Sequence, residues 1–282
     1  ANVVGAAVGG TAGVGGSVSV IVLQDTTTAS VGGSLTANAI TVKAESNELL
    51  ELSATAFQAA GTAAAGASVG TIVFKGKTFA IVRPGTTLTA ANGNIIVYAD
   101  SKEKVIMIVL GGGAGGTAAV NGSFAVLVMN VTTQARVEDG TSGNGSSLSA
   151  AKGSVTVKAT DTTDLNLNTG NANVGGAAAV GAAIEVAVYR NTVTAMIGNY
   201  NTVTAKSILV QAIADRDIQA AAVMASASGT ASINGSILVL SIGAGTTDPD
   251  ANKAETNGGG NSSDKASKEA SERGQADRKS VV

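Results

Sequence analysis

The sequence predicts an all-β fold built as a β-solenoid, in which similar stretches of chain stack as successive coils. Three observations support this: a repeat of 51 to 60 residues, constant spacing within two blocks of that repeat, and strands that alternate with period two. We favour a right-handed parallel β-helix with ~4.8 Å between stacked strands. An antiparallel β meander of repeated units is the alternative, because pairs such as Lys75-Gly76 could form two-residue hairpins.

Each repeat opens at a glycine that is followed by small residues. The opening glycines are Gly10, Gly61, Gly116, Gly176 and Gly229. They are spaced 51, 55, 60 and 53 residues apart, which gives about four and a half repeats. Small residues suit a tight corner where backbones approach closely. The repeat length leaves open one wide four-strand coil or two short coils.

An apolar strand follows each opening and keeps its register from repeat to repeat. The aligned positions are Val18, Val69, Phe124, Ile184 and Ile237, and two residues later Val20, Thr71, Val126, Val186 and Val239. A further strand of the pattern [IV]-x-V-x-A begins at Ile40, Ile95, Val155 and Ile208. These segments are rich in β-branched residues, as strands are.

All variation in repeat length falls between two rigid blocks. The first block runs 21 residues from the opening Gly to the position of Val31, and the second runs 17 residues from the position of Ala44 to the next opening. The segment between them varies from 13 to 22 residues. Fixed spacing is what stacked backbone ladders require, whereas surface loops tolerate length changes. We therefore expect loops near Gly32-Gly33, Pro84-Gly85, residues 139–147 and residues 198–201.

Helices are not expected in the repeated part. The tract 165–184 is rich in Ala but contains Gly170, Gly175, Gly176 and Gly181. Each glycine costs a helix ~1 kcal/mol relative to alanine.

Composition divides the chain into a repeated body, residues 1–245, and a polar segment, residues 246–282. The second segment holds 13 of the 38 charged residues and almost nothing to bury, so we expect a disordered linker or tail. Its last six residues, DRKSVV, resemble a translated sequencing adapter, and the chain starts at Ala1 with no Met and no signal-peptide pattern. We interpret the chain as a truncated environmental fragment.

Missing residue types exclude several kinds of chemistry. The chain has no His, Cys or Trp, which removes Ser–His–Asp and Cys–His nucleophile systems and sites that need imidazole or thiolate. A formal net charge of −2 argues against nucleic acid as a partner. No catalytic, cofactor-binding or metal-binding residue is assigned.

Two Gly-rich or apolar features have ordinary interpretations. The run GGGAGG at residues 111–116 satisfies G-x-G-x-x-G, but a strand follows it where a dinucleotide site needs a helix, so we interpret it as corner glycine. Residues 105–135 and 218–247 carry no charge. Polar residues interrupt both tracts, which argues against a membrane-spanning helix. Seven aromatic residues are too few for the aromatic rings that an outer-membrane β-barrel places at both membrane interfaces. Buried strands therefore account for the two uncharged tracts better than a membrane span or an outer-membrane β-barrel.

Acidic residues gather just after each [IV]-x-V-x-A strand. They are Glu45, Glu48, Glu51, Asp100, Glu103, Asp161, Asp164, Asp215 and Asp217. Stacking would align them along one exposed edge, where they could bind Ca²⁺ or supply an acid–base pair for polysaccharide cleavage. Lys102, Lys104 and Arg216 lie among them, which favours a solvated, neutralised edge over either site.

The repeats resemble those of very large bacterial leukotoxin-family filamentous adhesins and haemagglutinin-type exoproteins. The resemblance rests on the recurring phrases at residues 16–32 (GSVSVIVLQDTTTASVG), 122–140 (GSFAVLVMNVTTQARVEDG) and 182–199 (AAIEVAVYRNTVTAMIGN), and covers residues 1–245. It implies a β-helical fibre exported to the bacterial cell surface, with a host or neighbouring cell surface, matrix or glycan as partner. It assigns no site residue.

These observations lead to two hypotheses of function. The first is a non-enzymatic shaft or binding segment of a secreted, surface-exposed adhesin, stacked on neighbouring repeats of a longer chain. The second is a polysaccharide-acting β-helix enzyme that uses the acidic edge. An enzyme should interrupt the repeat to build a cleft, and the rigid blocks recur without interruption.

Overall fold

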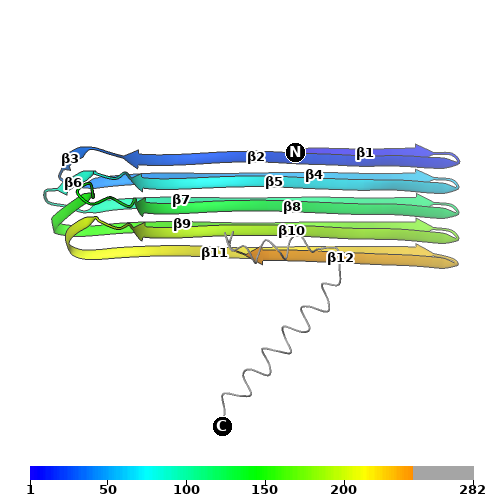
Figure 1. Cartoon of the computed structure of the whole chain (residues 1–282). Coiled ribbons are helices and arrows are strands. Elements are labelled where there is room, and N and C mark those ends of the chain that lie inside the picture. The colour runs from blue at the N-terminus through cyan, green and yellow to red at the C-terminus, as the bar shows by residue number, and fades with distance from the viewer. Residues whose placement is uncertain (244–282) are drawn as a thin grey trace, which may run out of the picture. The chain divides into compact units, whose positions relative to one another are not determined.

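A computed structural model describes residues 1–243, which form two β-sheets that lie face to face in a flattened parallel solenoid (Figure 1). The sheet that we call the first contains β1 (Asn2–Gly9), β3 (Ser34–Ala37), β4 (Ile40–Ala60), β6 (Thr87–Ala90), β7 (Ile95–Gly115), β9 (Ser147–Gly175) and β11 (Thr202–Ser228). The second sheet contains β2 (Ala12–Val31), β5 (Ala63–Val82), β8 (Ala118–Val137), β10 (Ala178–Ile197) and β12 (Ala231–Gly243). The predicted tail, residues 246–282, lies outside the described residues.

Each repeat makes one coil of two long strands. The chain crosses the second sheet, passes through a loop, returns along the first sheet and enters the next coil through a two-residue turn. Of the two alternatives, one wide coil per repeat is confirmed and two short coils are wrong; the coil does not have four strands, because strands of 20 residues or more run almost the whole width. In the first two coils, short breaks separate β3 from β4 and β6 from β7.

All strand pairings among the described residues are parallel, so the antiparallel meander is wrong. Lys75 and Gly76, the suggested hairpin, lie inside β5. The tract 165–184 is strand on both sides of the turn at Gly176 and Ala177.

The predicted register is confirmed residue by residue. Val20 pairs with Thr71, which pairs with Val126, and the row of aligned residues continues through Val186 to Val239. We call such a row across neighbouring strands a file. In the first sheet, Ile40 is aligned with Ile95 and Val155. The four predicted loops lie where repeat length varies, between the second sheet and the first.

The opening glycines form the stacked turns, as predicted. Gly116 donates a hydrogen bond to the carbonyl of Ala60 at 3.1 Å, and Gly176 donates to Gly115 at 3.1 Å. A Cβ added to Gly116 would collide with the carbonyl oxygen of Gly61 in the coil before it. Glycine is therefore required because successive turns stack backbone on backbone.

Side chains that point between the sheets form two apolar clusters separated by a polar layer. One cluster lies at the loop end of the coils and includes Val97 and Leu148. The other lies nearer the turns and includes Leu52, Phe74 and Met107. Coils supply these side chains from aligned positions, so each coil buries its apolar side chains against its neighbours. No helix within residues 1–243 is long and apolar enough to cross a membrane.

Candidate functional site

The acidic residues that the sequence singled out lie in adjacent files of the first sheet but on two different faces. In each strand, side chains alternate between the interior and solvent. The outward members are Glu45, Glu51, Asp100, Asp164, Asp215 and Asp217, and the inward members are Glu48, Glu103 and Asp161. The expected single exposed edge is therefore wrong for the inward group.

Lysines neutralise several of the outward carboxylates, as the solvated-edge interpretation expects. Lys104 lies 3.0 Å from Asp164, and Lys43 lies 2.8 Å from Glu45. The hydrogen bond between the latter pair raises the pKa of the lysine and lowers the pKa of the glutamate. These are exposed pairs whose contribution to stability is small.

Glu103 and Asp161 are enclosed between the sheets, where they are 2 % and 0 % exposed. The Thr163 hydroxyl lies between them, 3.3 Å from Glu103 Oε2 and 3.1 Å from Asp161 Oδ1. Asp161 also accepts hydrogen bonds from Asn191 Nδ2 and, at 3.1 Å, from the Thr133 hydroxyl. We call the side chains of Glu103, Asp161, Thr163, Tyr189 and Asn191 the buried polar layer.

Hydrogen-bond counting places the protons in this layer. Asn191 donates to the Tyr189 hydroxyl at 2.7 Å, and the hydroxyls of Tyr189 and Thr163 share a hydrogen bond of 2.6 Å. Thr163 has one hydrogen and can donate to only one of the two carboxyls. Asp161 has two other donors, Asn191 and Thr133, whereas Glu103 has one other, the Ser101 hydroxyl. Burial raises the pKa of Glu103 to about 8, so Glu103 is the carboxyl that suits the neutral form and Asp161 the one that suits the anion.

The pKa values follow the same division. Burial, together with the charge of Asp161, raises the pKa of Glu103 to about 8. Burial also raises the pKa of Asp161, but its hydrogen bonds from Asn191, Thr133 and Thr163 and the positive charge of Arg216 oppose the shift. Burial raises the pKa of Tyr189 to about 12. The layer is enclosed by both sheets, so a polysaccharide has no route to its carboxyls.

A second group of buried polar side chains lies nearer the turns. Asn121 Nδ2 donates to Gln58 Oε1 at 2.6 Å, and Asn173 Nδ2 donates to the carbonyl of Val180 at 3.0 Å. Thr169 donates to Glu185 at 2.9 Å, and burial raises the pKa of this glutamate. These side chains are buried inside the solenoid and are not open to solvent.

The glycine run at residues 111–116 has a different role from the expected corner. Gly111 and Gly113 lie inside β7, and only Gly116 lies in a turn. A Cβ on Gly111 would approach the Ser123 hydroxyl to 2.7 Å, and one on Gly113 would approach Asn173 Oδ1 to 3.2 Å. The glycines make room for the buried amides. β8 follows them, which confirms the strand expected after this run.

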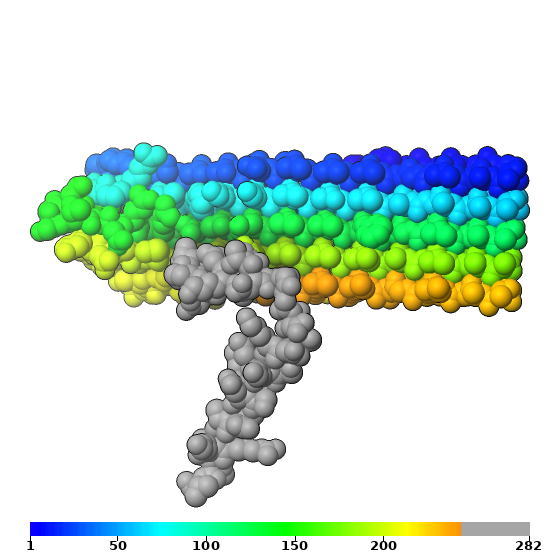
Figure 2. All heavy atoms as spheres, turned by 45° about the vertical axis from the view of Figure 1, so that its right-hand side comes forward, coloured from blue at the N-terminus to red at the C-terminus, as the bar shows by residue number. Residues whose placement is uncertain are grey.

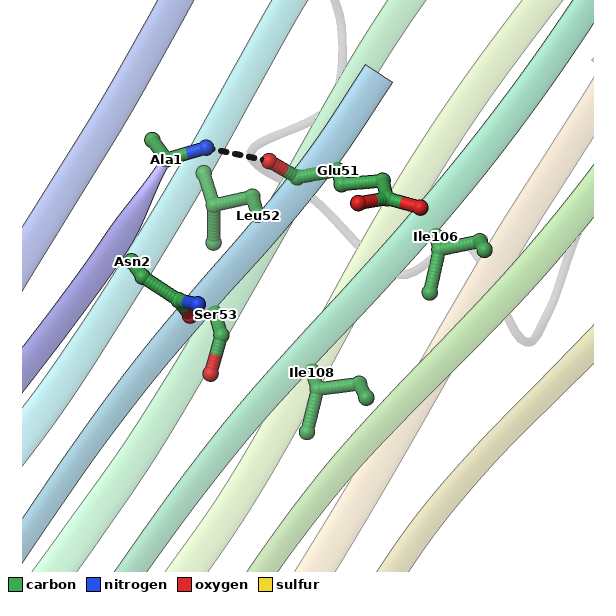
Figure 3. A pocket seen from close by; sticks show the side chains of 7 residues that line it. All are labelled: Ala1, Asn2, Glu51, Leu52, Ser53, Ile106 and Ile108. Carbon is green, nitrogen blue, oxygen red and sulfur yellow. Dashed lines mark hydrogen bonds between the residues drawn. The ribbon is translucent and has the colours of Figure 1, made fainter. Parts of the chain in front are cut away.

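A cavity among the described residues is a candidate for a binding or catalytic site. It has a volume of about 420 Å³ and lies where β1 begins beside β4 (Figure 3). Its N-terminal ammonium donates to the Glu51 carbonyl at 2.5 Å, and Leu52, Ile106 and Ile108 complete most of its wall. Glu51 is the one acidic side chain lining it, so it offers no convergent catalytic group.

Among residues 1–243, no three acidic side chains come together in a way that could hold a metal ion. The adjacent acidic files are interrupted by Thr160, Thr162 and Lys102, which occupy the intervening positions.

Sequence reasoning missed the buried polar layer, although one signal could have found it. Asp161 lies an even number of residues along its strand from Val155, Val157 and Ala159, and Glu103 lies an even number from Val97 and Ala99; we call such positions equal in parity. In a strand with buried Val and Ala, equal parity means the same face. Tyr189 and Asn191 have no such signal, because their strand is apolar on both faces.

Comparison with protein families, curated proteins and solved structures finds no match.

Proposed function

We propose that this chain is a structural shaft and attachment segment of a surface-exposed bacterial adhesin, without enzymatic activity. The observation that carries the proposal is the uninterrupted stacking of coils in one register, from β2 to β12. A stack of this kind offers extended flat faces, and Figure 2 shows the visible face as regular bands, one for each coil. The resemblance of the repeats to filamentous adhesins supports the extracellular location.

Two features support a non-enzymatic role. The carboxyls closest to an acid–base pair, Glu103 and Asp161, are enclosed and hold each other through Thr163. The exposed carboxylates are spread over successive coils and do not converge on one cleft. Attachment then comes from many weak contacts along the stack, which gain strength by avidity.

The test is to measure binding of the full chain to cells, matrix proteins and glycans, and to search for glycan cleavage products. The informative variant is Asp164→Asn with Asp217→Asn, since both outward carboxylates lie in one file of neighbouring coils. We expect binding to change less than about tenfold, because each contact is one of many. Glycan cleavage that this double variant abolishes would overturn the proposal.

A further inference from the structure

The outer face of the second sheet carries an apolar patch that the shaft proposal does not use. It consists of the outward side chains of residues 14–22 in β2 and of the aligned positions in β5, β8, β10 and β12. One file of it contains Val18, Val69, Phe124, Ile184 and Ile237. Val18 is 63 % exposed and Ile237 53 %. We call this surface the valine patch.

The valine patch is large for a soluble surface. Nine residues at ~3.3 Å and five strands at ~4.8 Å give about 700 Å². The largest apolar patch of a typical monomer is ~300–600 Å², and each partner in a stable complex contributes ~800 Å². The patch is therefore of a size that indicates an interface.

Charge is confined to the other half of the same face. The sole charged residue in the five aligned segments is Glu185, which points inward and is 1 % exposed. Lys75, Lys77 and Arg136 lie on β5 and β8 beyond the patch, on the loop side. The outer face of the first sheet, in contrast, mixes Glu51, Lys104 and Asp164 with apolar residues.

We propose that the valine patch pairs with the same patch of a second copy of this chain, so that two solenoids associate side by side. Flat faces of β-branched side chains pack as the two layers of a β-sandwich do, ~10 Å apart. A two-fold axis along the stacking direction would superpose the patches and leave the lysine-bearing halves at opposite rims. Both copies then bury apolar surface without burying a charge.

Other occupants fit less well. A glycan needs hydrogen-bonding groups for its hydroxyls, and the patch presents mainly Val and Ile. A membrane surface is usually bound through Trp and Tyr, and Phe124 is the patch's one aromatic side chain. Residues 246–282 contain no Ile, Leu, Phe, Met or Tyr, so this segment does not supply an apolar counterpart.

The test is analytical ultracentrifugation of the full chain over a wide range of concentration. Val126→Lys and Val186→Lys place an ammonium in the middle of the patch on adjacent coils. Thr132→Lys and Thr192→Lys are matched controls six residues along the same strands, outward in the polar half. Circular dichroism confirms that each variant keeps its β-structure.

We expect a dimer whose dissociation constant rises about a hundredfold or more in the patch variants, because a buried ammonium has no partner there. The control variants should keep the affinity of the original chain. A monomer at all concentrations, or a dimer that survives Val126→Lys, would overturn the proposal. So would patch-dependent binding to vesicles of phosphatidylglycerol and phosphatidylcholine by a monomeric chain. Neither result would affect the shaft proposal, whose test is attachment and cleavage.

Discussion

At the scale of single residues, the interior combines apolar clusters with many buried polar groups, among them Glu103, whose pKa burial raises to about 8. Glu103 lies near Asp161 on β9, Glu48 on β4 and Tyr189 on β10, and the positive charge of Arg216 on β11 acts on Asp161. Because burial favours its neutral form, this glutamate binds a proton more tightly in the folded chain than in the unfolded chain. Stability is thereby linked to pH.

The first prediction concerns that linkage. The pKa of Glu103 rises from 4.5 to about 8 on folding, so its contribution is full below pH 4.5 and is lost as pH rises to 8. The free energy of unfolding should fall through this window by up to ~1.4 kcal/mol per pH unit. Glu103→Gln, which keeps a neutral donor, should flatten the profile.

Urea denaturation at several pH values measures this effect. Glu51→Gln is the matched control, because Glu51 is outward and exposed on the neighbouring strand. An unchanged pH dependence in Glu103→Gln would show that Glu103 is not the protonated group.

The second prediction concerns the turn glycines. Gly116→Ala should destabilise the chain by about 1–3 kcal/mol, because the new methyl group collides with the Gly61 carbonyl of the preceding coil. Gly10→Ala is the control at the equivalent turn, where an added Cβ meets nothing within 4 Å. Equal loss in the two variants, measured by thermal denaturation, would argue against backbone stacking at the turns.

At the scale of elements, strands and loops could be predicted from the repeat and its constant blocks. The faces of the strands could not all be predicted, because strands such as β2 are apolar on both sides: Leu23 points inward while Val22 is 64 % exposed. In the first sheet, where Val and Ala alternate with Lys and Thr, parity does reveal the interior. The single exposed acidic edge is wrong because Asp161 and Glu103 alternate in phase with the buried Val and Ala of their strands.

The third prediction compares a loop with a strand. In the loop before β9, residues 141–143 are exposed, whereas Ser146 is buried and donates to the Arg83 carbonyl at 2.9 Å. Deleting residues 141–143 should change the free energy of unfolding by less than ~0.6 kcal/mol. Deleting Val126 should abolish cooperative unfolding, because Leu127 and Met129 would turn outward.

Both deletions are compared by urea denaturation followed by circular dichroism. Similar tolerance of the two would contradict the assignment of rigid blocks and variable loops.

At the scale of the whole molecule, one coil per repeat accounts for the constant spacing, the glycine turns and the flat outer faces. The same stacking that encloses the carboxyls exposes the valine patch, since alternate residues of each long strand must face outward. The proposed shaft, attachment surface and lateral pairing all depend on coils stacked in register.

The most direct test is a pair of distances between spin labels, which the absence of cysteine makes simple to attach. Labels at Val18 and Ile237 are far apart in the chain but lie in one file, four strand spacings apart, about 19 Å. Labels at Val18 and Thr28 lie in one strand, ten residues and about 33 Å apart. With labelled chain diluted in unlabelled chain, the account predicts that the pair distant in sequence is the closer in space. A longer or broad distance between Val18 and Ile237 would contradict it.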